Sequence, residues 1–144
     1  MNWFFKLLGH IWLSPITLIV LIGLGIMCIF RQVKLVGKTC ISLVFAVLHG
    51  SKLSNYMVNG HWAGWSGGGC IVVRTPITGG ILAHENCHVL QQMLFGVTFP
   101  FVYLTEMLLV KFVKKGRPYY DNRFEVDARA YAAISENQMK NAMR

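Results

Sequence analysis

The stretch that decides the fold is ILAHENCHVLQQMLF, residues 81–95. Its apolar residues recur every three to four positions, which predicts a helix with one face in a core. The helix is expected to begin after Thr78 or Gly80 and to stop at Gly96, since glycine is common just past a helix end. Burying His, Glu and His near the start of such an apolar helix costs free energy unless something offsets it.

These three polar residues, His84, Glu85 and His88, form an H-E-x-x-H pattern. Side chains four positions apart on a helix share a face, so both imidazoles can reach one ion. Zinc would acidify a bound water and polarise a carbonyl, and the adjacent carboxylate could act as general base. The pattern therefore predicts Zn²⁺ bound by His84 and His88, with Glu85 as the catalytic residue. The alternative is two histidines on a helix without a metal.

A catalytic zinc site needs a third protein ligand. The possible ligands are Asp121, Glu125, Asp127 and the remaining histidines. We favour Glu125, because it stands at the start of a predicted helix over residues 123–143. On that helix the small residues Ala128 and Ala132 would let two helix backbones approach closely.

Glu125 also has a structural interpretation. The run Asn122-Arg123-Phe124-Glu125 fits a capping box, in which Glu125 would reach back to the backbone of Asn122. Glu125 could instead pair with Arg129, one turn further along the helix.

The segment FEVDARAYA, Phe124–Ala132, resembles the third-ligand helix of gluzincin metallopeptidases. It is most similar to the membrane family that contains the CAAX prenyl endopeptidase and the bacterial heat-shock membrane protease. Positions that match the family's two motifs are His84, Glu85, His88, Glu125 and Ala128. The family has an aspartate that supports a zinc histidine where this chain has Arg129, so the resemblance leaves that role to Asp127 or Asp121.

Other residues fit the same chemistry less specifically. CIVVRT, residues 70–75, predicts a strand that is either the substrate-pairing edge strand found in zincins or an ordinary core strand. Tyr119, Tyr120 and His61 could stabilise an oxyanion, or could be structural. Gln91 and Gln92 are expected beside the ligands or at the surface, not as ligands.

The composition points to a membrane. Of 144 residues, 54% are hydrophobic and only 14% are charged, which excludes a disordered chain and disfavours a freely soluble one. Residues 11–30 carry no charge and can span about 30 Å as a helix, so we predict a transmembrane helix there, with a buried core helix as the alternative. We expect residues 39–50 to form an interfacial helix and residues 93–113 a core or membrane-leaning helix. The glycine-rich segment 49–69 is predicted as loops.

The charged residues and the cysteines bear on the binding partners, the membrane topology and disulfide formation. The net charge of +8 is concentrated beside apolar segments, as in juxtamembrane residues, and no nucleic-acid motif accompanies it, so we expect no nucleic-acid partner. Arg31, Lys34 and Lys38 outnumber Lys6 and the terminal amine, and they predict a single-pass protein with its C-terminal domain in the cytoplasm. The four cysteines lack C-x-x-C spacing and are expected to be unpaired.

The sequence thus predicts a mainly α fold with a small β-element. Residues 1–50 would form a membrane-anchoring segment, and residues 51–144 a minimal zincin-like domain. The expected function is membrane-anchored, zinc-dependent hydrolysis of peptide bonds in a peptide or protein substrate, with the lipid bilayer as the other partner. The alternative is an inactive structural or interaction protein that keeps the fold.

Overall fold

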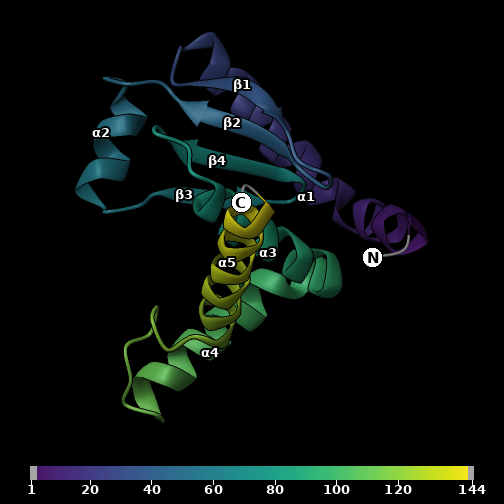
Figure 1. Ribbon diagram of the computed structural model, residues 1–144, viewed down its shortest axis with the longest axis vertical. Coiled ribbons are helices and arrows are strands. Elements are labelled where there is room, and N and C mark those ends of the chain that lie inside the picture. The colour runs from purple at the N-terminus through teal and green to yellow at the C-terminus, as the bar shows by residue number, and fades with distance from the viewer. Residues whose placement is uncertain (1–2, 143–144) are drawn as a thin grey trace.

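A computed structural model describes residues 3–142 and shows a mainly helical chain built around one small mixed sheet (Figure 1). The elements follow in the order α1 (Trp3–Ile29), β1 (Val33–Lys38), β2 (Leu43–Val47), α2 (Lys52–Asn59), β3 (Gly64–Gly67), β4 (Cys70–Arg74), α3 (Gly79–Phe95), η1 (Gly96–Thr98), α4 (Phe99–Phe112) and α5 (Arg123–Ala142). The predicted fold class, a mainly α chain with a small β-element and an apolar N-terminal helix, is confirmed at this level.

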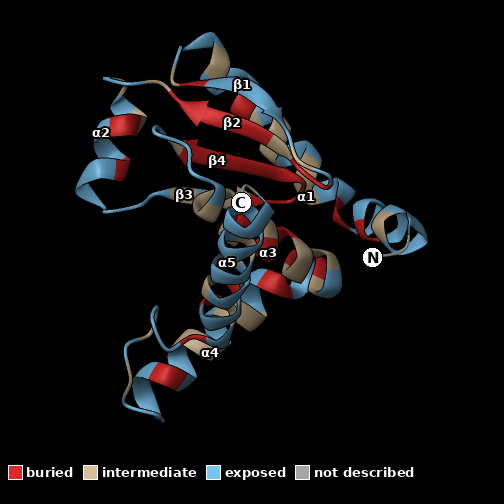
Figure 2. Ribbon diagram, in the orientation of Figure 1, coloured by how far each residue is buried: buried red, intermediate tan, exposed pale blue. Residues whose placement is uncertain are grey.

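The sheet has the strand order β1-β2-β4-β3. β2 pairs with β4 in parallel, whereas β1 and β3 pair antiparallel with their neighbours. The central strands β2 and β4 are almost wholly buried, as Figure 2 shows. β1 and β3 therefore form the two open edges of the sheet.

Successive side chains of a strand point to opposite faces of the sheet, and this divides the core into two layers. Cys70 and Val72 of β4 pack with Leu24 of α1 and Met57 of α2 on one face of the sheet. Their neighbours on β4 point to the opposite face, where Val89 of α3 lies. α1 runs behind the sheet and extends beyond it, and α3 covers the other face (Figure 1). The sheet is thus enclosed between α1 and α3, with α5 packed on α3.

Two predictions about secondary structure between residues 39 and 69 are wrong. The segment 39–50, predicted as an interfacial helix, contains β2, because its short apolar run pairs with β1 and β4 and is buried on both faces. The domain boundary predicted at residue 50 falls between strands that belong to one sheet. The segment 49–69, predicted as loops, contains α2 and β3; Ser51 caps α2 by accepting a hydrogen bond from the backbone of Ser54 at 3.0 Å.

Within residues 3–142, two stretches are long and apolar enough to cross a membrane by length and composition, Trp3–Ile29 and Gly79–Phe112. The first contains the predicted span 11–30 apart from Phe30. The second is not one straight helix, since η1 separates α3 from α4 and Gly96 has a φ of +59°. The indole of Trp12 lies where a Gly96 side chain would project, so this bend needs glycine for both its conformation and its space.

Candidate metal centre

The helices α3 and α5 bring the predicted site residues together. The Thr78 side chain caps α3 by accepting from the backbone of Ile81, so this helix begins one turn before His84. On α5, Ala128 is fully buried, as expected for the close approach of two helices. Glu125 consequently faces α3, and Asn122 caps α5 through its own side chain, which accepts from the backbone of Phe124 at 2.9 Å.

Three donor atoms converge between the two helices. The Nε2 atoms of His84 and His88 lie 3.2 Å apart. Oε2 of Glu125 lies 3.4 Å from His84 Nε2, and Oε1 lies 3.2 Å from His88 Nε2. Ligands about 2.0–2.1 Å from a tetrahedral zinc would be separated by about 3.3 Å, so the observed spacing fits one ion held by all three residues. A metal-binding group made of these residues was the prediction, and the structure shows that they could hold one.

The carboxylate of Glu125 carries a further sign of a cation site. It is buried, and its Oε2 atom has no hydrogen-bond partner among residues 3–142. Burial raises the pKa of Glu125, but the neighbouring His84, His88 and Tyr103 outweigh burial and hold this pKa well below its usual range. A buried, ionised carboxylate with an unpartnered oxygen is suited to a positive ligand.

Gln91 orients one of the histidines. Its amide nitrogen donates to the backbone oxygen of Phe124 at 3.0 Å, which turns its amide oxygen toward His88. His88 Nδ1 then donates to that oxygen at 2.8 Å, so Nε2 is the ring nitrogen that faces Glu125 and His84. Burial lowers the pKa of His88, but hydrogen bonds with Glu125 and Gln91 outweigh it and raise the pKa overall. Gln91 thus has the orienting role that metal-binding histidines usually require.

Tyr103 is a site residue that the sequence analysis missed. Its hydroxyl donates to Glu125 Oε1 at 2.8 Å, and its ring stacks on Phe124 with the centroids 6.0 Å apart. In the sequence, the only indication of this role is that Tyr103 places one phenol hydroxyl within the apolar run that forms α4. That signal is weak, because only the bend at Gly96 turns α4 toward α5.

The side chain of Glu85, a residue of α3, lies against the edge strand β3. A Cβ atom on Gly64 would come within 2.7 Å of Glu85 Oε1, so the strand can approach the carboxylate this closely only with glycine at that position. Burial raises the pKa of Glu85, whereas His88, His84 and a hydrogen bond with Ser66 partly offset it. A general base beside a metal needs a carboxyl group whose pKa is raised, and burial beside the candidate metal site provides this for Glu85.

The neighbouring Gln92 joins β3 to the same helix. Its amide oxygen accepts from the backbone of Gly68 at 2.7 Å, and its amide nitrogen donates to the backbone oxygen of Ser66 at 3.3 Å. Gln91 and Gln92 therefore tie α3 to α5 and to β3, respectively. The prediction that neither glutamine is a ligand agrees with these contacts.

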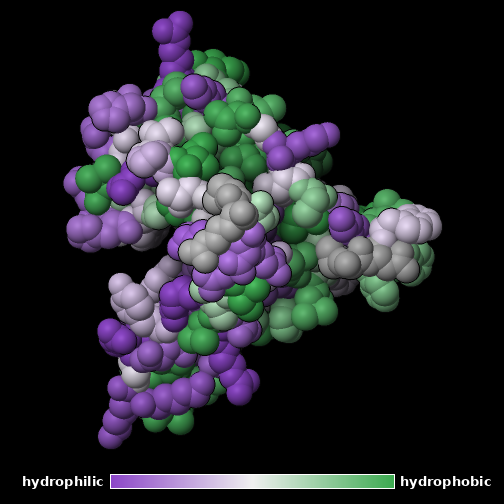
Figure 3. Space-filling view, viewed as in Figure 1, coloured by the Kyte–Doolittle hydropathy of each residue, from purple (hydrophilic) through white to green (hydrophobic). Residues whose placement is uncertain are grey.

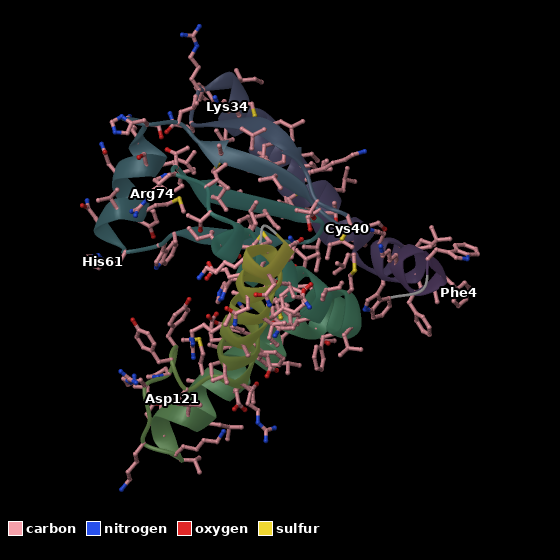
Figure 4. All side chains as sticks on the ribbon, viewed as in Figure 1. Phe4, Lys34, Cys40, His61, Arg74 and Asp121 are labelled. Atoms are coloured by element: carbon pink, nitrogen blue, oxygen red, sulfur yellow. The ribbon has the colours of Figure 1, made fainter. Side chains whose placement is uncertain are left out.

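A cleft of about 1100 Å³ opens over the three donor atoms and Glu85. β3 and α3 form much of its wall, and Ile16 and Val20 of α1 reach it from the other side. Tyr119, Tyr120 and His61, the predicted oxyanion donors, all line it. Figure 4 shows that His61 and Asp121 lie on separate segments of the chain. Burial raises the pKa of Tyr119, which keeps the phenol protonated and able to donate.

The strand predicted over residues 70–75 is β4, but it is not the edge strand. β4 lies between β2 and β3 and is fully paired, because β3 covers the side that faces the cleft. The ordinary core-strand interpretation of this segment is therefore correct. The strand available at the cleft is β3.

The alternative third ligands do not join the metal-binding group. Asp121 and Asp127 are exposed, and Asp121 Oδ2 instead accepts from the backbone of Arg117 at 2.6 Å. His10, His49 and His61 are also exposed, and within residues 3–142 the group that could hold an ion comprises only His84, His88 and Glu125.

Arg129 takes neither the family aspartate's role nor the predicted pairing with Glu125. One guanidinium nitrogen donates to the backbone oxygen of Tyr120, and the guanidinium lies over the Tyr120 ring, 5.8 Å from its centroid. Its Nη1 atom is buried without a hydrogen-bond partner in the described part of the chain. Arg129 thus fixes the tyrosine segment at the rim of the cleft.

The chain was compared with protein-family models, with curated proteins and with solved structures, and none of the three comparisons gives a match.

Proposed function

We propose that the protein is a membrane-associated zinc peptidase. The observation that carries the proposal is the spacing of 3.2–3.4 Å between the donor atoms of His84, His88 and Glu125. It is supported by a buried carboxylate, Glu85, placed between this group and an open sheet edge. The resemblance of the two motifs to gluzincins agrees with this assignment, with Gln91 orienting a histidine in a chain that lacks the family's aspartate.

Each chain residue then has a defined task. Bound zinc would supply a Lewis acid that acidifies water and polarises the scissile carbonyl. Glu85 accepts a proton from the attacking water and delivers it to the leaving amine nitrogen, so that hydrolysis yields one carboxylate and one amine. Tyr119, Tyr120 or His61 donates a hydrogen bond to the developing oxyanion.

Substrate binding follows from the position of β3. Its outer edge is unpaired in the described chain and lies along the cleft, so an extended peptide can add to the sheet through main-chain hydrogen bonds. Such pairing holds a peptide backbone next to Glu85 with little demand on its side chains. The proposed substrate is therefore an extended segment of a peptide or protein.

Membrane association comes from α1, whose exposed surface is apolar along most of its length. Figure 3 shows hydrophobic side chains at the surface where this helix extends from the body of the molecule. The cations Arg31, Lys34 and Lys38 follow it in the chain and can bind the anionic headgroups of a cytoplasmic leaflet. The catalytic part is accordingly assigned to that side.

Arg129 supports a second candidate function, a catalytically inactive membrane protein that retains the metal-binding group. It stands where the resembled family has an acidic residue, and one of its buried nitrogens has no partner among residues 3–142. In this alternative the centre would have a structural or binding role.

Metal analysis combined with one substitution separates the two functions. The purified full-length protein is expected to hold one zinc per chain and to cleave a quenched fluorescent peptide. Glu85→Gln should retain the zinc and lose about 10²–10⁴-fold in rate, because only the proton transfer is removed. Glu106→Gln is the matched control, since Glu106 pairs with Lys114 at 2.8 Å, away from the centre, and its rate should be unchanged.

A wild-type protein that binds no zinc would rule out both the peptidase and the metal-retaining alternative. Bound zinc with the same rate in wild type and Glu85→Gln would favour the inactive protein.

A further inference from the structure

We infer that α1 does not cross the bilayer but lies in the plane of one leaflet, with its outer face among the acyl chains. The inference concerns how the chain meets the membrane and is independent of the proposed peptidase activity. It replaces the single-pass topology expected from the sequence. The argument rests on what packs against α1 and on what remains exposed along it.

One side of α1 is covered by the rest of the protein along most of the helix. At its start, Gly9 contacts Met93 of α3, where an added Cβ would lie 2.9 Å from the Met93 side chain. In its middle, Thr17 accepts a hydrogen bond from the backbone of Gly69 at 3.0 Å. Toward its end, Cys28 packs on the sheet core. From residue 9 to residue 28 the helix rises about 28 Å, close to the hydrocarbon thickness of about 30 Å.

A transmembrane α1 would therefore carry the sheet to the same depth in the membrane. The β1 edge of the sheet is open and does not line the cleft, so its backbone groups would then face lipid. Open sheet edges do not occur in the hydrocarbon region, because their unpaired N–H and C=O groups find no water there. Lys34 and Lys38 on β1 are exposed as well. This packing and a transmembrane orientation of α1 are thus incompatible.

The opposite side of α1 presents a continuous apolar surface, which we call the lipid stripe. Its members recur every three to four residues, are all exposed and include no polar side chain: Leu8, Ile11, Pro15, Leu18, Ile22, Ile26 and Ile29. An apolar face of this length, on a helix whose other face is packed on protein, is suited to burial just below the headgroups.

The charges near α1 agree with this orientation. Lys6 lies near one end, and Arg31, Lys34 and Lys38 follow the other, whereas residues 7–30 contain no charged side chain. Cations at both ends of an in-plane helix can reach anionic headgroups of the same leaflet. The occupant of the lipid stripe is therefore the acyl layer of an anionic membrane, and not a second protein chain.

Topology can be tested on the full-length chain with one epitope tag at the N-terminus and a different tag inserted at Gly50, in the exposed turn after β2, so that of the two apolar stretches only α1 lies between the tags. The protein is reconstituted into vesicles of phosphatidylcholine and phosphatidylserine and digested by a protease added outside. An in-plane helix keeps both tags of a molecule on one side, so every molecule loses both tags or neither. Detergent-opened vesicles are the control in which both tags are lost. A substantial population that keeps one tag and loses the other would show that α1 crosses and would overturn the inference.

Lipid contact is tested by a matched pair of substitutions. Ile22 of the lipid stripe and Ile134 of α5 are exposed to nearly the same extent, 58% and 59%. Ile22→Asp is expected to lower co-flotation with the same vesicles about tenfold or more, whereas Ile134→Asp leaves it unchanged. Equal losses of co-flotation in the two variants would refute contact between the lipid stripe and lipid. The same conclusion would follow if the wild-type protein were a dimer and Ile22→Asp broke the dimer but left co-flotation unchanged. Circular dichroism verifies that both variants remain folded.

Discussion

The adjacent glutamines of α3 allow a sharp test of how the metal centre is organised. Gln91→Leu keeps a similar side-chain volume but removes the acceptor for His88 Nδ1, at 2.8 Å, and the donor to the Phe124 backbone oxygen, at 3.0 Å. Without its acceptor the imidazole is no longer fixed with Nε2 toward the other donors. We therefore expect zinc affinity to fall.

The size of the effect follows from these two contacts. Loss of a residue that orients a metal-binding histidine typically weakens metal affinity by about 10–100-fold, which corresponds to about 1.4–2.7 kcal/mol. The metal-free protein should also lose about 1–3 kcal/mol of its free energy of unfolding, because two polar groups lose their partners. Zinc affinity is measured by competition with a chromogenic chelator, and stability by denaturant titration.

Gln92→Leu provides the control. It also removes two hydrogen bonds, those with Gly68 and Ser66, but these hold β3 and not a ligand. Its stability should fall by a similar amount, while its zinc affinity should stay within about threefold of wild type. If both substitutions weakened zinc binding equally, or if Gln91→Leu left it unchanged, the orienting role of Gln91 would be refuted.

Three further changes have defined outcomes. Gly64→Ala places a Cβ 2.7 Å from Glu85 Oε1, so peptidase activity should fall about 10–100-fold without loss of zinc, as measured by turnover and metal content. Tyr103→Phe removes the 2.8 Å hydrogen bond to the Glu125 carboxylate, and denaturation should show a loss of about 1.5–3 kcal/mol. Finally, the stability of the metal-free protein should depend on pH. The contribution of Glu125, whose pKa is lowered, is complete above about pH 4.5 and is lost as pH falls; that of His88, whose pKa is raised, is complete below about pH 6.5 and is lost as pH rises.

Controls are available for each of these changes. Gly37→Ala introduces the same side chain where no atom lies within 4 Å, so it should leave the turnover rate intact. The pH profile of metal-free Glu125→Gln should be flatter than that of wild type between these two limits. A Tyr103→Phe protein as stable as wild type, or a fully active Gly64→Ala protein, would contradict the geometry described above.

The centre was predictable because its signals are local. The H-E-x-x-H spacing already implies a shared helix face, and the caps of α3 at Thr78 and Gly96 are visible in the sequence. Glu125 was harder to assign, because a capping box and a metal ligand require the same residue type near a helix start. In the structure the Glu125 side chain is buried beside His84 and His88, where it could help to hold an ion, and Asn122 caps the backbone of α5 with its own side chain.

The sheet was less predictable because its pairing is not local. β2 has the length and apolar content of either a short strand or a buried helical segment, and its parallel partner β4 follows only after α2 and β3. β3 is composed of Gly64-Trp65-Ser66-Gly67, a sequence typical of a loop, and becomes a strand only because β4 and Gln92 hold it. Tyr103 was missed for the same reason, since its position depends on the bend at Gly96.

The packing of α1 has a practical consequence for producing the protein. Deleting residues 1–30 is the usual way to obtain a soluble fragment of a protein with an apolar N-terminal helix. Here that deletion would remove Leu24 from the core cluster that also contains Val33, Phe45 and Val72. Losing one such buried leucine costs about 2–5 kcal/mol, a large part of the stability of a small domain. The fragment should therefore unfold or aggregate, and purification should begin from the intact chain in a mild detergent.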